Sequence, residues 1–292
     1  MSEVQLLEKV KRLGVQAMFS DDDLLDMLVL KGGNAMALIH RLSARASVDL
    51  DFSMRHDFPN GIEGIRKKVE KVLEETFWEN GFKVFDLKTV EKPSVVSPDM
   101  ANFWGGYGVE FKLITAELFK THGADLEALR RHALVIGQGQ KFLIDISRFE
   151  YVQDKQEADL DGYKIYVYSP EMIVCEKLRA ICQQMPAYGP IIKRGRAGTA
   201  RARDFVDIHV LVSALNLDIT SEKVQQTLTD MFAIKKVPLA FLGHIAEFKD
   251  FHRQDFPAVQ ATMAVTADVR DFDFYFQHTL DLVETLKPLW NK

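Results

Sequence analysis

Two aspartates one residue apart form the chemically most informative pair in the chain. Asp49 and Asp51 flank Leu50 in the stretch VDLDF at positions 48–52. Side chains two positions apart on a strand project from the same face, so both carboxylates point toward one place while Leu50 enters the core. Two like charges repel each other and resist burial, whereas carboxylate oxygens suit Mg²⁺ or Mn²⁺. The pair therefore predicts a divalent-cation site.

A two-glycine turn lies just before this pair. Gly32 and Gly33 follow a predicted buried strand at 27–30 and open a short helix, with Lys31 beside them. Glycine lets backbone amides approach phosphate oxygens closely, and a helix N-terminus adds the positive end of its dipole. The turn therefore indicates phosphate binding, and the alternative is an ordinary strand-to-helix connection.

Two polar residues between the turn and the aspartates could serve the same ligand. Ser47 could donate a hydrogen bond to a phosphate, or it could cap the local backbone. Arg45 could contact a phosphate, or it could pair with Asp49 or another acid. The sequence leaves both pairs of alternatives open.

Four motifs along the chain occur in an order that is known from one enzyme superfamily. They are KGGNA at 31–35, RASVDLDF at 45–52, LIDIS at 143–147, and, counted as one motif, the paired helical segments EKLRA at 176–180 and RDFVD at 203–207. In this order they resemble the polymerase-β-type nucleotidyltransferases, in the form found in the AbiEii/AbiGii abortive-infection toxin branch. The resemblance covers roughly residues 25 to 215.

The resemblance implies an enzyme that moves a nucleoside monophosphate from a nucleoside triphosphate (NTP) to an acceptor. RNA, in particular tRNA, is the acceptor that we expect, and the protein would be the toxin of a two-protein system with a cognate antitoxin. The alternatives are transfer to a small-molecule or protein hydroxyl, and an inactive nucleotide-binding interaction protein.

Such a transfer is expected to use two Mg²⁺ or Mn²⁺ ions, which clamp the attacking and leaving oxygens. Two ions require more than two carboxylates, so a third should come from a neighbouring strand. Asp145 is the first candidate because it is the lone charge in FLIDI at 142–146. Its alternative role is a strand-end acid that faces water, and Glu110 is the rival ligand.

Three charged residues on predicted helices complete the implied site. Lys177 aligns with a lysine that faces the triphosphate in the family, although a helical lysine could also pair with Glu171 or Glu176. Asp204 and Asp207 share one helix face, and the resemblance implies that they position the surroundings of the nucleotide. Their alternative is a structural salt bridge, to Arg203 or Arg179, near a helix N-terminus.

Cationic residues gather in the segment IKRGRAGTARAR at 192–203, although the whole chain carries a net charge of −5. An acidic chain has to meet a polyanion through a local basic patch. We therefore expect this segment to bind the phosphates of the nucleotide or of an RNA acceptor, with a solvated surface loop as the alternative. The residues concerned are Arg194, Arg196, Arg201 and Arg203.

Composition is that of an ordinary globular protein, with 47% hydrophobic and 27% charged residues. The apolar stretches are too short to cross a membrane, and the first residues lack the features of a signal peptide, so we expect no membrane partner and a cytoplasmic location. Cys175 and Cys182 lie on one predicted helix, too far apart to pair. Both are expected to be buried thiols.

The order of elements predicts an α+β fold. Strands dominate up to residue 168, and helices follow Ser169 and Pro170, a serine N-cap with proline in the first turn. Together with the resemblance, this predicts a polymerase-β-like catalytic core, a mixed sheet with helices, over 1–168. A helical C-terminal domain over 169–292 would complete the active-site cleft. The expected helices span 3–18, 61–79, 170–184, 203–215, 221–232 and 271–287, and the expected strands 27–30, 82–90, 106–116, 141–147 and 163–168.

Overall fold

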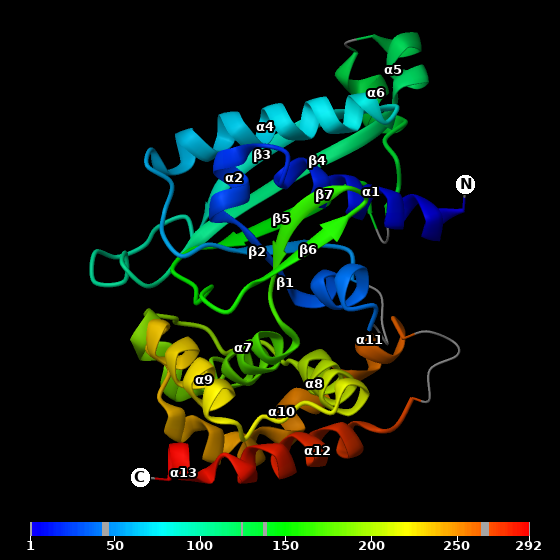
Figure 1. The fold of residues 1–292 in the computed structure, drawn as a ribbon. Helices are drawn as coiled ribbons and strands as arrows, with labels where there is room; N and C mark the ends of the chain where they lie inside the picture. Colours follow the sequence, from blue (N-terminus) through cyan, green and yellow to red (C-terminus); the bar gives the residue numbers. More distant parts are fainter. Residues whose placement is uncertain (1, 43–46, 124, 137–138, 264–268, 292) are drawn as a thin grey trace.

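A seven-stranded mixed sheet forms the first half of the chain in the computed structural model, which describes residues 2–42, 47–123, 125–136, 139–263 and 269–291. The strand order is β3-β4-β5-β2-β1-β7-β6 (Figure 1). The expected mixed sheet with helices is therefore confirmed. The strands are β1 Val29–Lys31, β2 Leu50–Ser53, β3 Phe82–Lys92, β4 Gly106–Thr115, β5 Phe142–Ser147, β6 Gln156–Leu160 and β7 Tyr163–Val167.

The centre of the sheet sets the position of the charged residues found in the sequence. Strand β2 pairs antiparallel with β1 and parallel with β5. In that register Lys31 lies opposite Asp51, and Asp51 lies opposite Asp145. Three charged residues from three strands thus form one row across the sheet, although up to 114 positions separate them in the chain.

One face of these strands is apolar and covered. Leu50 and Phe52 of β2 are fully buried, and so are the alternating apolar residues of β5, whereas Asp51 and Asp145 are half-buried on the opposite face. Helix α1 approaches the apolar face closely, because a Cβ on Gly14 would lie 2.7 Å from Leu50 Cδ1. Each buried Leu or Phe stabilises the fold by about 1.5–3 kcal/mol. Core packing on one face therefore fixes the carboxylates on the other.

Helices cover the sheet and then continue alone. Those that precede residue 168 are α1 Glu3–Met18, α2 Asp22–Met27, α3 Gly32–Asn34, a π-helical turn Ala35–Ile39, α4 Gly61–Glu79, α5 Ala116–His122 and α6 Leu126–Arg131. The later ones, which gather below the sheet in Figure 1, are α7 Pro170–Cys182, η2 Pro186–Ile192, α8 Ala202–Leu215, α9 Glu222–Ile234, η3 Leu239–Phe248, α10 Lys249–Arg253, α11 Phe256–Gln260, α12 Phe272–Thr285 and α13 Lys287–Trp290.

Helix α7 begins where the sequence indicates. The Ser169 hydroxyl accepts a hydrogen bond from the Met172 amide, and Pro170 occupies the first turn. Both cysteines of this helix are buried free thiols, as expected. In the described part of the chain every strand precedes α7 and only helices follow it. The division into a 1–168 and a 169–292 domain stays a prediction.

Several short elements depart from the expectations. Strand β6 and helices α5 and α6 were not predicted, and the predicted strand at 27–30 is displaced to Val29–Lys31. Only Leu160 of β6 is buried, so its sequence carries no clear alternation. Among the helices of the described residues, none combines the length and the apolar character that crossing a membrane requires.

Candidate active site

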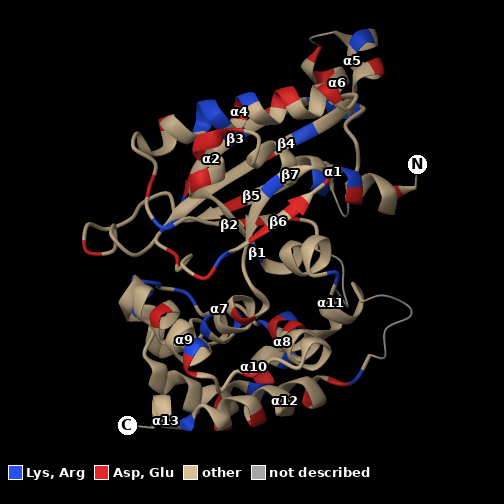
Figure 2. Cartoon of the chain, in the orientation of Figure 1, with Lys and Arg blue, Asp and Glu red and all other residues tan. Residues whose placement is uncertain are grey.

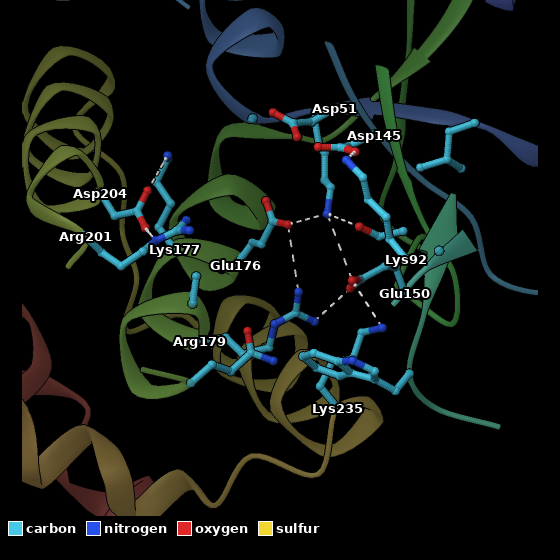
Figure 3. Close-up of a pocket in the computed structure, with 18 of the residues that line it drawn as sticks. Asp51, Lys92, Asp145, Glu150, Glu176, Lys177, Arg179, Arg201, Asp204 and Lys235 are labelled. Atoms are coloured by element: carbon cyan, nitrogen blue, oxygen red, sulfur yellow. Dashed lines mark hydrogen bonds and ion pairs between the residues drawn. The ribbon is translucent and has the colours of Figure 1, made fainter. Parts of the chain in front are cut away.

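A cavity of about 660 Å³ lies between the sheet and the helical half. Its walls come from the Gly32–Gly33 turn, β4, β5, helix α7 and the basic segment at 192–203. Figure 3 shows Asp51 and Asp145 side by side on one wall, with Lys177, Arg201 and Asp204 on another. Residues that the sequence places in four separate motifs therefore meet in one cavity.

Asp51 and Asp145 present their carboxylates to this cavity. Asp145 forms an ion pair with Lys92, whose side chain lies over Gly108, where a Cβ would stand 2.3 Å from Lys92 Cε. Burial raises the pKa of Asp51 to about 6; Lys31 opposes this rise, and the charges of Glu176 and Asp145 add to it. An acid that resists ionisation beside a second carboxylate is what a cation site shows before its cation binds.

Asp49 stands apart from the cavity lining. It precedes β2, its side chain is exposed, and its carbonyl oxygen accepts a hydrogen bond of 2.6 Å from Asn34 Nδ2. Although the residue is exposed, partial desolvation of its carboxylate and the charge of Asp145 both raise the pKa of Asp49. The described residues contain no group of three or more His, Cys, Asp or Glu close enough to hold a metal ion. The three-carboxylate metal site accordingly stays a prediction.

Two of three further predicted residues have clear locations. Glu110 lies outside the cavity lining and pairs with Lys141, at 2.6 Å between Nζ and Oε1. Ser47, by contrast, lines the cavity. Arg45 lies outside the described residues.

The glycine turn supports Asp51 directly. Gly32 has a φ of +68°, which side-chain-bearing residues rarely adopt, and a Cβ there would lie 2.7 Å from Asp51 Oδ2. Lys31 and Gly33 also line the cavity. The turn thus needs glycine both for its backbone conformation and for its approach to the carboxylate.

Gly32→Ala is expected to destabilise the protein more than Gly162→Ala does. Gly162 also has a positive φ, of +86°, but nothing lies within 4 Å of the place of its Cβ. Both variants should lose about 1–2 kcal/mol for the strained backbone, and Gly32→Ala a further ~1–3 kcal/mol for overpacking. Urea unfolding of both variants measures the difference. Equal losses would show that Asp51 moves aside freely.

A buried network of alternating charges forms the base of the cavity, and it was not predicted. Lys31 Nζ lies 2.7 Å from Glu176 Oε1 and 3.2 Å from Ser147 Oγ. Glu150 Oε2 lies 2.8 Å from Arg179, and Glu150 Oε1 lies 3.3 Å from Lys235. We call Lys31, Glu150, Glu176, Arg179 and Lys235 the charge network, and Figure 3 labels the last four of them. It joins strand β1 to helix α7 and to the end of α9.

Glu150 is the centre of this network. Burial alone would raise its pKa, but Arg179, Lys235 and Lys31 hold the pKa of Glu150 well below its usual range. Burial lowers the pKa of Lys235 to about 8, against the attraction of Glu150. Lys235 Nζ also donates to the carbonyl oxygens of Arg148, at 2.6 Å, and Phe103, at 3.2 Å. Glu150 therefore stays charged while it is buried.

Lys177, on helix α7, pairs with two acids of helix α8 and is not free in the cavity. Its Nζ lies 3.1 Å from Asp204 Oδ1 and 2.6 Å from Asp207 Oδ2, and all three residues are buried. Arg201 Nε contacts the other oxygen of Asp204 at 2.5 Å. Although burial opposes it, Arg201 and Lys177 hold the pKa of Asp204 well below its usual range. The two acids form a salt bridge, as one alternative proposed, but its partners are Lys177 and Arg201.

The basic segment divides between two places. Arg196, Arg201 and Arg203 line the cavity, whereas Arg194 does not. Arg194 donates instead to the carbonyl oxygens of residues 183, 184 and 185, just beyond the end of α7. The described residues that line the cavity include eight Lys or Arg and five Asp or Glu. Figure 2 shows cationic segments around α7, on the side that faces the sheet. The cavity is thus net positive in a chain of net charge −5.

Comparisons with known proteins agree with this arrangement. The family described as "Nucleotidyl transferase AbiEii toxin, Type IV TA system" matches residues 15–278. No curated protein matches the chain. The crystal structure of JHP933 from Helicobacter pylori is similar with a TM-score of 0.50 and 16% identity, covering 100% of this chain and 94% of that one. A putative nucleotidyltransferase from H. pylori has a TM-score of 0.50 and 17% identity, covering 100% and 98%.

Identities this low show a shared fold only. The family match, in contrast, spans most of the chain and includes all four motifs and the cavity that they line. The protein therefore belongs to the AbiEii nucleotidyltransferase toxin family.

Proposed function

We propose that this nucleotidyltransferase uses a divalent cation to transfer a nucleoside monophosphate from an NTP to RNA, tRNA being the first acceptor to test. We further propose that it acts as a toxin whose partner is an antitoxin. One observation carries the proposal. Asp51 and Asp145 lie in register on one wall of a cavity whose remaining charges are mostly cationic. Such a cavity suits a cation-bound triphosphate.

The donor set fits Mg²⁺ or Mn²⁺. Asp51 and Asp145 supply carboxylate oxygens, and the pKa of Asp49 responds to the charge of Asp145. Lys92 would have to release Asp145 when a cation binds there. These residues would hold one or both of the ions that the family resemblance implies. A bound ion would activate the acceptor hydroxyl and stabilise the charge that develops on the leaving oxygen.

The cationic walls suit the rest of the substrate. The acceptor oxygen would bond to the α-phosphorus while the α–β bridging oxygen leaves with pyrophosphate. Arg201 and Arg203 line the same cavity as the carboxylates, and the charge of Arg203 acts on both Asp49 and Asp51. Their guanidinium groups would neutralise the polyphosphate as charge moves to pyrophosphate. Lys177, held by two acids, would position α8 beneath this wall.

A transfer assay tests the proposal. The protein is incubated with each α-labelled NTP in turn, total tRNA and Mg²⁺, and the products are separated by size. Label should appear in RNA with at least one NTP, and EDTA should abolish it. Label in protein or in a small molecule would make RNA the wrong acceptor. No label with any NTP would favour the nucleotide-binding alternative without catalysis.

A further inference from the structure

A second cavity, of about 770 Å³, lies on the other side of the basic segment. The described residues that line it include three cations, Lys193, Arg194 and Arg196, and no carboxylate. Two partly exposed rings, Phe248 and Phe251, complete its wall. In a chain with five more acidic than basic residues, a cavity with only positive charges indicates a ligand that carries negative charge.

The rest of this cavity is open backbone and small residues. Three of its lining residues are glycines, at 189, 195 and 198, and two are prolines, at 186 and 190. Flat rings, guanidinium groups and accessible backbone are the features with which proteins bind unpaired nucleotides, because every base has a face that can stack. A protein partner's acidic segment would match the cations, but its carboxylates would not stack on the exposed rings.

Two links join this cavity to the active site. Arg196 lines both cavities and, among the described residues, has no ion-pair partner, whereas Lys193 lies 2.7 Å from Asp99. The second link is α10. Its Phe251 ring contacts the His252 ring at 5.0 Å between centroids, and His252 Nδ1 accepts a 3.1 Å hydrogen bond from the Arg201 amide. A polymeric ligand bound in the second cavity would therefore extend toward Arg196 and Arg201.

We propose that the second cavity binds unpaired nucleotides of the RNA acceptor. Their bases stack on Phe248 and Phe251, and Arg196 holds the phosphate that passes into the active-site cavity. This inference rests on the proposed function, because it requires an RNA acceptor. It adds the requirement that the acceptor presents a single-stranded segment.

Binding of a labelled 12-nucleotide single-stranded RNA of mixed sequence tests the proposal. The double variant Phe248→Leu/Phe251→Leu keeps the apolar volume and removes both π faces. It should bind the RNA at least about tenfold more weakly, since stacking of one base contributes about fivefold or more and two rings are lost. Its affinity for trinitrophenyl-ATP should not change. Phe274→Leu is the matched control, because Phe274 is an exposed ring of the helical half that does not line either cavity.

The outcomes separate this inference from the proposed function. Equal RNA affinity of the wild type and a folded double variant overturns it and makes a protein segment the better occupant, while label transfer to tRNA would still support the proposed function. Transfer to a non-RNA acceptor overturns both. If the double variant fails to fold, hydrogen exchange of the wild type decides. Protection of 186–198 and 248–251 by the RNA supports the proposal, and unchanged exchange there overturns it.

Discussion

Asp51→Asn is expected to lower nucleotidyl transfer by more than about a hundredfold and, at neutral pH, to make the folded protein more stable. The loss of activity should exceed that figure because even outer-shell partners of a metal contribute 10- to 100-fold, and Asp51 is proposed as a direct ligand. The stability gain has a separate cause. The Asp51 carboxylate is buried beside Glu176 and Asp145, so its ionisation opposes folding.

The direction of the pH effect follows from the pKa of Asp51, which is about 6 in the folded protein against an ordinary 3.8. As the pH falls from about 6 to 4, the folded state takes up this proton before the unfolded state does. The wild type therefore gains stability from Asp51 on acidification, by up to about 3 kcal/mol. Asp51→Asn lacks this change, so the variant should be more stable than the wild type at pH 7, and the difference in stability should become small near pH 4.

Asp86→Asn is the matched control, because its expected effect on stability at pH 7 has the opposite sign. Arg130 and Lys112 lower the pKa of Asp86 to about 2, so its carboxylate stabilises the fold above pH 4 and that stability is lost on acidification. Its φ of +50° suits asparagine. This variant should lose stability at pH 7 and keep its transfer activity. Urea unfolding between pH 4 and 7.5 measures both differences. An Asp51→Asn protein that is less stable at pH 7, yet active, would assign Asp51 a structural role.

The long helices of the fold could be predicted from the sequence. Helices α1 and α4 occupy the residues that their amphipathic patterns indicate, and α7 begins at its serine cap. The meeting of Asp51 and Asp145 was predicted from the order of the family's motifs, and the apolar residues beside each aspartate indicate that it lies on the face away from the core. The strand order was not predictable, since β1 has three residues and β6 has little alternation.

The charge network shows why part of the site escaped prediction. Glu150 and Lys235 are 85 positions apart, and a lysine just beyond a helix normally lies in water. Only the long-range packing of α9 against α7 buries Lys235 and brings it to Glu150. The sequence did carry one sign of the charge network. Glu176 and Arg179 lie three apart in the EKLRA motif, so they share a helix face. The resemblance gave a role to Lys177 of this motif and none to these two residues.

Glu150→Gln is expected to destabilise the protein by about 3–5 kcal/mol. Glu150 is only 3% exposed, and its carboxylate is the shared partner of Arg179, Lys235 and, at 3.9 Å, Lys31. Removing one member of a buried ionic group leaves uncompensated charge, which costs about this much. Because the cations hold the pKa of Glu150 below its ordinary 4.5, the difference from the wild type should be complete above that pH and narrow as the solution is acidified.

Asp161→Asn is the control for Glu150→Gln, because it removes an exposed ion pair. The comparison separates the effect of burial on stability from the effect of ion pairing. Asp161 pairs with Arg12, at 2.8 Å from Nε, but both side chains are more than one third exposed. A loss below about 1 kcal/mol is expected there, and asparagine tolerates the positive φ at this position. Thermal and urea unfolding at pH 7 compare the two variants.

Since Lys31 and Arg179 line the active-site cavity, a folded Glu150→Gln protein should also bind nucleotide more weakly, because these cations lose the carboxylate that orients them. Similar small losses in both variants would mean that water reaches Glu150, and the charge network would then be ordinary surface electrostatics.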